Sequence, residues 1–258
     1  MSPLHPIGSD PIAIRRALEE GWQAFCRHAA VLTGFTVLVG GLHVLAWVAY
    51  RGSGGLLEGG QPQPAPEQLG LAIAALGVYL FSGCWLVVGL VQGAELALEG
   101  GHPKLGPLLR LDGLALARLA WTSLFLLLLL ALVLQVGEVS SWLLTWLIPG
   151  LAPLPTWAAR ALIVYAVADQ VLVVPITVLG QQAGLAAFRS GRRATDPHWL
   201  YALGLTAVVA LILLAGFLLL IGLVAALPIA FCTLTAAYRQ LFVIPVGPRA
   251  EGAPRTPA

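Results

Sequence analysis

Charged side chains are scarce in this sequence, because Lys, Arg, Asp and Glu together make up only 10% of its 258 residues. An ordinary soluble domain has roughly 25%. Hydrophobic residues make up 59%, which is more apolar surface than a water-soluble globule buries. Leucine-rich runs such as residues 124–134 need surroundings as apolar as themselves, and a lipid bilayer provides them. The composition therefore predicts a membrane protein.

The sequence also lacks a strong net charge of either sign. The formal net charge is +2, from 14 basic and 12 acidic residues. A broad basic field of the kind that binds nucleic acid is therefore not expected. We predict the lipid bilayer, including anionic lipid, as the partner of this chain, with other membrane proteins as further candidates and no nucleic acid.

Cysteine is rare, and motifs that support catalysis are missing. The 3 cysteines are far apart and show no Cys-x-x-Cys spacing. The sequence has no Gly-x-x-x-x-Gly-Lys phosphate loop, no His-Glu-x-x-His helix and no Gly-x-Ser-x-Gly elbow. We predict no catalytic residues, no metal site, no cofactor and no enzymatic activity.

What is present is a series of long apolar stretches. About 20 apolar residues in a helix cross roughly 30 Å of hydrocarbon. Such stretches occupy residues 29–50, 69–92, 115–136, 157–179 and a longer block, 199–242, which we expect to fold back at Gly216 and Gly222. The predicted fold class is all-α: a polytopic transmembrane bundle of about six helices, with cytoplasmic amphipathic helices. The predicted regions are an amphipathic segment at 1–28, a membrane domain at 29–242 and a disordered cytoplasmic tail at 243–258.

The basic residues predict how the chain is oriented. With six spans, all of the 14 basic residues except Arg51 and Arg160 fall on one side of the membrane. Basic residues favour the cytoplasmic side. Both termini are therefore predicted to be cytoplasmic, in a bacterial inner membrane or an internal membrane.

Basic, partly apolar segments precede each pair of spans, at residues 10–28, 100–114 and 181–198. In the first, Ile14, Leu18, Trp22 and Phe25 recur at helical spacing, which predicts a helix lying on the inner leaflet. The regular spacing suggests one unit used three times, although any protein with an even number of spans places basic loops at such intervals. The basic side chains either bind anionic lipid or only set the topology, and both interpretations stay open for these residues: Arg15, Arg16, Arg189, Arg192 and Arg193. On the outer side, residues 140–147 are predicted to form a short interfacial helix.

Residues 100–109, 184–193, 222–228 and 237–241 resemble a loosely defined group of bacterial multi-pass membrane proteins. These proteins are related to the membrane domain found ahead of some glycerophosphodiester phosphodiesterases. The resemblance implies a six-helix membrane domain without an agreed biochemical role. The tail after Phe242 is short, and the metal-binding residues of the phosphodiesterase are missing, so we expect no such domain here.

Asp169 and Gln170 stand out because they lie near the middle of the predicted span 157–179. A charge at that depth costs roughly 2.5–3.5 kcal/mol, so Asp169 should be protonated, paired or turned to the interior. It could serve as a proton or ion relay, or tie helices together through hydrogen bonds. His43 in the first span is a possible partner. At the cytoplasmic end of the second span, Glu95 and Glu99 could pair with Lys104 or Arg110, but surface pairs of this kind contribute little, so we interpret the two glutamates as part of a solvated face.

Two functions follow from these observations. The first is a non-enzymatic membrane protein that acts as a scaffold, assembly factor or lipid-organising component. The alternative is a small secondary transporter or channel-like protein that uses Asp169. An Asp169 side chain capped by its neighbours favours the first, whereas a water-filled cavity that reaches Asp169 favours the second.

Overall fold

The computed structural model describes residues 11–53, 66–219 and 222–242, and these residues form helices, turns and loops without a β-strand. Six helical stretches in the described residues are long and apolar enough to cross a membrane. The predicted all-α class with about six spans is therefore confirmed. Such a set of helices is typical of a multi-pass membrane protein.

The long helices pair into hairpins. The hairpins are α1 (Ile14–Gly52) with α2 (Pro66–Leu98), α4 (Gly113–Leu147) with α5 (Leu154–Asp169), and α8 (Trp199–Leu218) with α9 (Leu223–Phe242). The shorter elements are α3 (Leu105–Leu108), η1 (Pro149–Leu151), α6 (Val173–Val178), α7 (Leu185–Thr195) and η2 (Asp196–His198). The predicted turn at Gly216 and Gly222 is confirmed, since α8 ends at Leu218, shortly after Gly216, and α9 begins at Leu223, directly after Gly222.

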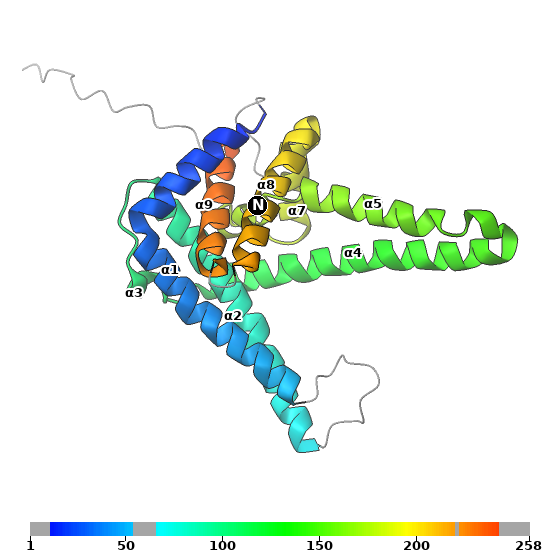
Figure 1. Ribbon diagram of the computed structural model, residues 1–258, viewed down its shortest axis with the longest axis horizontal. Helices are drawn as coiled ribbons and strands as arrows, with labels where there is room; N and C mark the ends of the chain where they lie inside the picture. The colour runs from blue at the N-terminus through cyan, green and yellow to red at the C-terminus, as the bar shows by residue number, and fades with distance from the viewer. Residues whose placement is uncertain (1–10, 54–65, 220–221, 243–258) are drawn as a thin grey trace, which may run out of the picture.

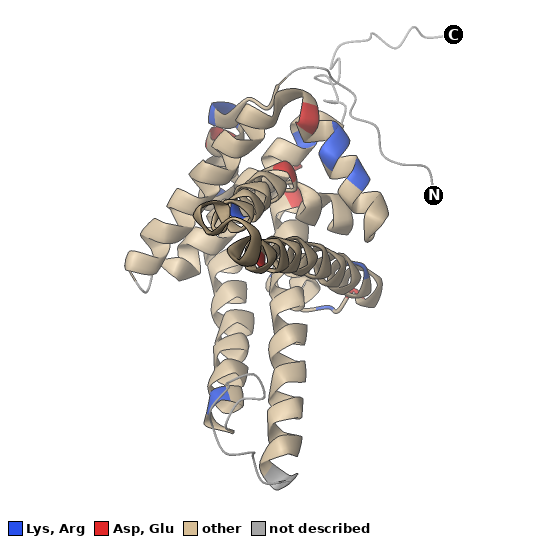
Figure 2. Ribbon diagram, turned by 90° about the vertical axis from the view of Figure 1, so that its right-hand side faces the viewer, with Lys and Arg blue, Asp and Glu red and all other residues tan. Residues whose placement is uncertain are grey.

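The hairpins diverge from a shared centre, which we call the hub and define as the first half of α1 together with α6, α7 and α9. Buried residues from all four of these segments form one apolar cluster. In Figure 1 the α1–α2 hairpin extends downward from the hub and the α4–α5 hairpin extends to the right. Figure 2 shows that most charged residues lie in the upper part of the molecule, around the hub, whereas the lower ends of α1 and α2 are almost free of them.

α9 is the central helix of the hub. Of its apolar segment, 56% is buried inside the protein, against 11% in α4 and in α5. The buried face of α9 is made mostly of small residues, among them Ala230, Thr233, Ala236 and Ala237. In contrast, α4 carries large leucines that stay exposed, such as Leu127 at 65%. Hydrocarbon is the medium in which such a surface is stable, so the α4–α5 hairpin is suited to a bilayer.

α1 consists of two straight parts that meet at His28, whose backbone angles (φ −128°, ψ 22°) are not helical. This kink lies where the predicted amphipathic segment ends. The first part crosses α9 through the small residues Ala17, Gly21 and Ala24, all of them buried. A Cβ atom on Gly21 would lie 2.7 Å from the backbone of Thr233, so the two helices touch through their backbones.

The predicted interfacial helix at residues 140–147 is wrong as a separate element, because α4 continues through it to Leu147. No proline or glycine lies between Glu138 and Leu147, so nothing in this stretch ends the helix. It stops at Ile148, directly before Pro149.

The predicted span 157–179 is also wrong as a single helix. α5 ends at Asp169, and a turn leads into the short helix α6. Pro175 explains the break, because proline has no backbone N–H for Val171 and its ring collides with the carbonyl of that residue in a continuous helix. The change of direction places Asp169 at the hub.

The predicted amphipathic segment at 100–114 contains only the four-residue helix α3. Asp112 then caps the start of α4, and its Oδ1 accepts a hydrogen bond from the backbone N–H of Ala115 at 3.0 Å. The predicted segment at 10–28 is helical from Ile14. Residues 1–10 and the predicted tail at 243–258 lie outside the described residues.

The contact between α1 and α9 can be tested with alanine in place of Gly21. Alanine in a helix normally stabilises by about 0.5–1 kcal/mol relative to glycine. At Gly21 the added Cβ meets backbone, and overpacking of this kind costs about 1–3 kcal/mol. We expect G21A to lower the midpoint of thermal unfolding in detergent. The control is G34A in the same helix, where a Cβ meets nothing within 4 Å and stability should hold or rise. Equal midpoints for the two variants would contradict the close crossing.

Candidate functional site

Asp169 lies under α7 with both carboxylate oxygens engaged. Its side chain is almost fully buried, at 3% exposure. Oδ1 lies 2.6 Å from the hydroxyl oxygen of Thr195, near the end of α7. Oδ2 accepts a hydrogen bond from Nε2 of Gln170 at 2.8 Å. The aspartate therefore joins the end of α5 to the end of α7.

Further polar side chains surround this contact, and we call the group the Asp169 cluster: Asp169, Gln170, Gln182, Ser190 and Thr195, all of them buried. Ser190 donates its hydroxyl proton to Oε1 of Gln182 at 2.5 Å. Gln170 also donates to the backbone carbonyl of Phe188 at 3.3 Å. Oε1 of Gln170 is buried without a hydrogen-bond partner, facing Gly191, where a Cβ would lie 2.8 Å away.

The small residues of α7 explain how it covers Asp169. Its buried face consists of Ala187, Ser190, Gly191, Ala194 and Thr195. Such residues let a helix approach its neighbours closely. At the start of α7, the backbone N–H of Gly184 donates to Oγ1 of Thr122 in α4 at 2.9 Å. α7 is therefore docked against the α4–α5 hairpin along one side.

His43, considered above as a possible partner of Asp169, makes its contacts elsewhere. Nδ1 of His43 lies 3.0 Å from the carbonyl oxygen of Tyr79 and 3.2 Å from the hydroxyl of Ser82, both in α2. Its ring stacks on Tyr79 with 4.1 Å between ring centroids. The hydrogen-bonding partners of His43 thus lie within the α1–α2 hairpin. This hairpin diverges from the one that carries Asp169 (Figure 1).

The arginines of α7 lie on its exposed face. Arg192 pairs with Asp196 at 3.2 Å, and the other carboxylate oxygen of Asp196 accepts a hydrogen bond from Tyr165 at 2.8 Å. Arg189 and Arg193 are exposed, and neither forms an ion pair within the described part of the chain. α7 and η2 together carry three arginines against one aspartate, so the local charge is positive.

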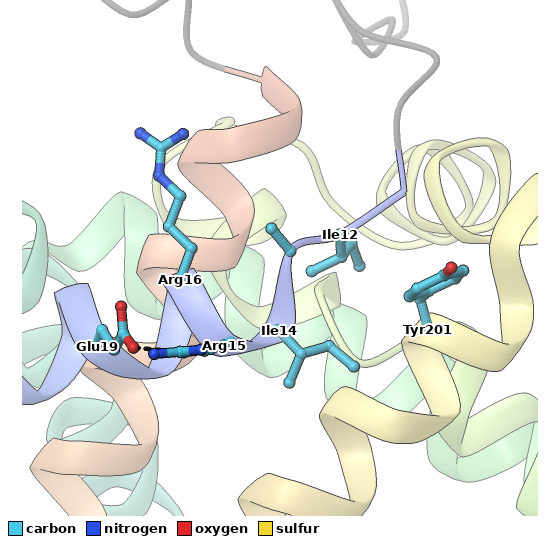
Figure 3. A pocket seen from close by; sticks show the side chains of 7 residues that line it. Ile12, Ile14, Arg15, Arg16, Glu19 and Tyr201 are labelled. Carbon is cyan, nitrogen blue, oxygen red and sulfur yellow. Dashed lines mark hydrogen bonds and ion pairs between the residues drawn. The ribbon is translucent and has the colours of Figure 1, made fainter.

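The two arginines in the first turn of α1 are compensated locally. Arg15 pairs with Glu19 and Arg16 with Glu20, each at 2.7 Å across one helical turn. Figure 3 shows Arg15 directed toward Glu19, beside a shallow hollow of about 340 Å³ that Ile12, Ile14 and Tyr201 also line. Exposed pairs of this kind contribute little to stability but cancel the net charge of this surface.

The least exposed ion pair of the described residues links α2 to α9. Nη1 of Arg239 lies 2.7 Å from Oε1 of Glu95 and 3.7 Å from Oε1 of Glu99, so neither the solvated face nor the alternative pairing with Lys104 or Arg110 is correct for Glu95. The next residue, Gln240, exchanges two hydrogen bonds with the backbone of Ala13, at 3.0 and 3.4 Å. The last turn of α9 thus holds the end of α2 and the start of α1.

No known protein family, no curated protein and no solved structure matches this chain. The resemblance to the membrane domain of glycerophosphodiester phosphodiesterases therefore stays a prediction. Within residues 11–53, 66–219 and 222–242, no group of three or more His, Cys, Asp or Glu side chains could hold a metal ion.

The pair of Glu95 and Arg239 can be tested by neutralising one partner. Their side chains are only 20% and 26% exposed, so the remaining charge is left poorly solvated. Breaking a fully buried pair costs about 3–5 kcal/mol, and for this partly exposed pair we expect about 1–3 kcal/mol from either E95Q or R239Q. The free energy of unfolding of each variant in detergent, compared with that of the native chain, measures this loss of stability.

A variant of the exposed pair, R15Q, is the matched control and should leave stability unchanged, because Arg15 and Glu19 are 91% and 55% exposed. The double variant E95Q/R239Q should be less destabilised than the sum of its single variants. Additive effects would show that the two side chains do not interact.

Proposed function

We propose that this protein is a non-enzymatic integral membrane protein that organises anionic lipid, with the exposed face of α7 as the lipid-binding surface. The observation that carries the proposal is the division of α7 into two faces. One face of small residues is docked on neighbouring helices, and the other presents Arg189 and Arg193 without a carboxylate partner in the described residues. We place the hub at the cytoplasmic side, as the distribution of basic residues predicts.

The spacing of these arginines suits a phosphate group. Arg189 and Arg193 are four residues apart, so they neighbour each other on one helix face. Each guanidinium group offers five N–H donors in a planar fork that matches phosphate oxygens. The two guanidinium groups can therefore bind one phosphate headgroup from two sides.

Exposed apolar side chains lie at the start of α7, on the side of Arg189 away from Arg193, where the rest of a lipid would lie. Leu185 is one turn before Arg189 on the same helix and is 46% exposed. Trp121 of α4 is 61% exposed and lies against Gly184, where a Cβ would be 2.8 Å from its ring nitrogen. An exposed tryptophan is typical of the membrane interface, where its amphipathic ring lies at the level of the headgroups.

The capping of Asp169 favours this scaffold function over the transporter. Both oxygens of its carboxylate have partners, and α7 covers it with small residues. A transporter that uses Asp169 needs a path to this side chain. The alternative would be favoured if the reconstituted protein transported a solute, and if D169N abolished this transport while the protein stayed folded.

The lipid preference can be measured directly. Purified protein in a mild detergent is mixed with phosphatidylglycerol or phosphatidylcholine, and bound lipid is counted by native mass spectrometry. We expect more phosphatidylglycerol to be retained. An arginine near an anionic surface contributes about 1 kcal/mol, so R189Q/R193Q should lose about 2 kcal/mol, roughly 30-fold in affinity.

The charge-matched control is R15Q/R16Q, which removes two arginines that already pair with Glu19 and Glu20. It should keep the preference for phosphatidylglycerol. Added salt should weaken binding to the native chain, because exposed charges are screened. Equal retention of both lipids by the native chain, or an unchanged preference in R189Q/R193Q, would contradict the proposed surface.

A further inference from the structure

The α4–α5 hairpin carries two oppositely charged side chains that have no ionic partner. Glu138 of α4 and Arg160 of α5 are both exposed, in the half of the hairpin that is nearer to its tip at η1. Neither forms an ion pair within residues 11–53, 66–219 and 222–242. The guanidinium carbon of Arg160 lies 5.3 Å from the ring centroid of Trp157, so the ring covers one face of the guanidinium group and leaves the N–H donors at its edge.

These two side chains project from the same side of the hairpin. The helices touch at Gly137 and Ala159, since a Cβ on Gly137 would lie 2.6 Å from that of Ala159. Glu138 and Arg160 each follow one of these contact residues, and one residue turns a helix by about 100°. Because α4 and α5 run in opposite directions, the two turns lead to the same side of the hairpin. At 1.5 Å of rise per residue, the two charged residues differ in height by about 3 Å.

α7 and η2 contact the hairpin from the other side. Phe125 of α4 and Tyr165 of α5 are each turned about 120° from the contact residues in the opposite sense, and they meet α7 and η2. We call the side with Glu138 and Arg160 the free face. By helical spacing it also carries four exposed apolar side chains, within about 40° of the charged ones: Leu127, Leu134, Val164 and Val167.

We propose that the free face binds the same face of a second copy of this chain, so that the protein is a two-fold symmetric dimer through its α4–α5 hairpins. Both copies cross the bilayer in the same direction, so the two-fold axis that relates them runs along the membrane normal. Rotation about this axis keeps each residue at its height and places α4 of one copy opposite α5 of the other. Glu138 therefore meets Arg160 of the second copy, and the reciprocal pair forms as well.

Charge favours a second copy over lipid as the occupant of the free face. A face with one acid and one base at nearly equal height on neighbouring helices is complementary to itself. An anionic headgroup suits Arg160 but is repelled by Glu138 on the same face, whereas a second copy supplies a partner of opposite sign to each. The four helices then enclose the apolar side chains of both free faces, as in a four-helix bundle. This inference does not depend on lipid binding by α7.

Charge reversal distinguishes pairing between copies from pairing within one chain. E138R makes both positions of a chain positive, and R160E makes both negative. Each variant alone should dimerise poorly, because like charges then face each other across the two-fold axis. A mixture of the two should dimerise again as a heterodimer, because every positive position faces a negative one. Pairing within one chain gives no such recovery.

Sedimentation equilibrium of the purified full-length protein in mild detergent measures the dissociation constant of the dimer. We expect each single variant to raise it by at least about 30-fold, which corresponds to about 1 kcal/mol for each of the two pairs lost. Capture of differently tagged copies through one tag then detects the heterodimer. The matched controls are R15E and E19R, which reverse a pair that lies within one helix and should leave the dissociation constant unchanged, alone or mixed.

E138Q/R160Q gives a second measurement without repulsion, which serves if a reversed charge prevents folding. It should also weaken the dimer, by roughly 30-fold. A native chain that is monomeric, with detergent or lipid on the free face, would overturn the proposal. The same conclusion would follow from a native dissociation constant in E138Q/R160Q, or from E138R and R160E that do not recover dimerisation when mixed.

Discussion

The close crossing of α1 and α9 is the contact on which the rest of the structure depends. At Gly21 the two helices touch through their backbones, which is possible only because no side chain stands there. This approach brings the last turn of α9 to the start of α1, where Gln240 bonds to Ala13. The same turn carries Arg239 to Glu95, so α2 is fixed by the same helix. One helix of mostly small buried residues thereby sets the positions of two others.

The sequence was a good guide to what lies within a helix and a poor guide to what lies between helices. Apolar length predicted the six spans, and glycines predicted the turn between α8 and α9. The break after Asp169 was missed because hydropathy continues through it, although Pro175 was a signal for it. The end of α4 was also missed. The predicted span was ended at the length that crosses a bilayer, although no residue before Pro149 stops the helix.

The candidate site shows the same division. Asp169 and Gln170 were found because they are polar residues in an apolar stretch. Thr195 was not, because an uncharged threonine gives no signal until α7 folds back on the end of α5. Glu95 was considered as a partner of Lys104 or Arg110, which are near it in sequence, whereas only the packing of α9 against α2 brings Arg239 to it. His43 also stood out as a polar residue in an apolar stretch, but its hydrogen-bonding and stacking partners lie on the adjacent helix of its own hairpin.

The unequal lengths of the helices have a consequence for the lipid around them. α4 has 35 residues and is about 52 Å long, whereas α8 has 20 residues and is about 30 Å long. Hydrocarbon about 30 Å thick accommodates α8 along its whole length. It accommodates only part of α4, such as the apolar stretch 115–136, because Glu138 lies beyond that stretch. The last turns of α4 therefore reach past the hydrocarbon, and the exposed rings of Trp142 and Trp146 in these turns are suited to the headgroup layer.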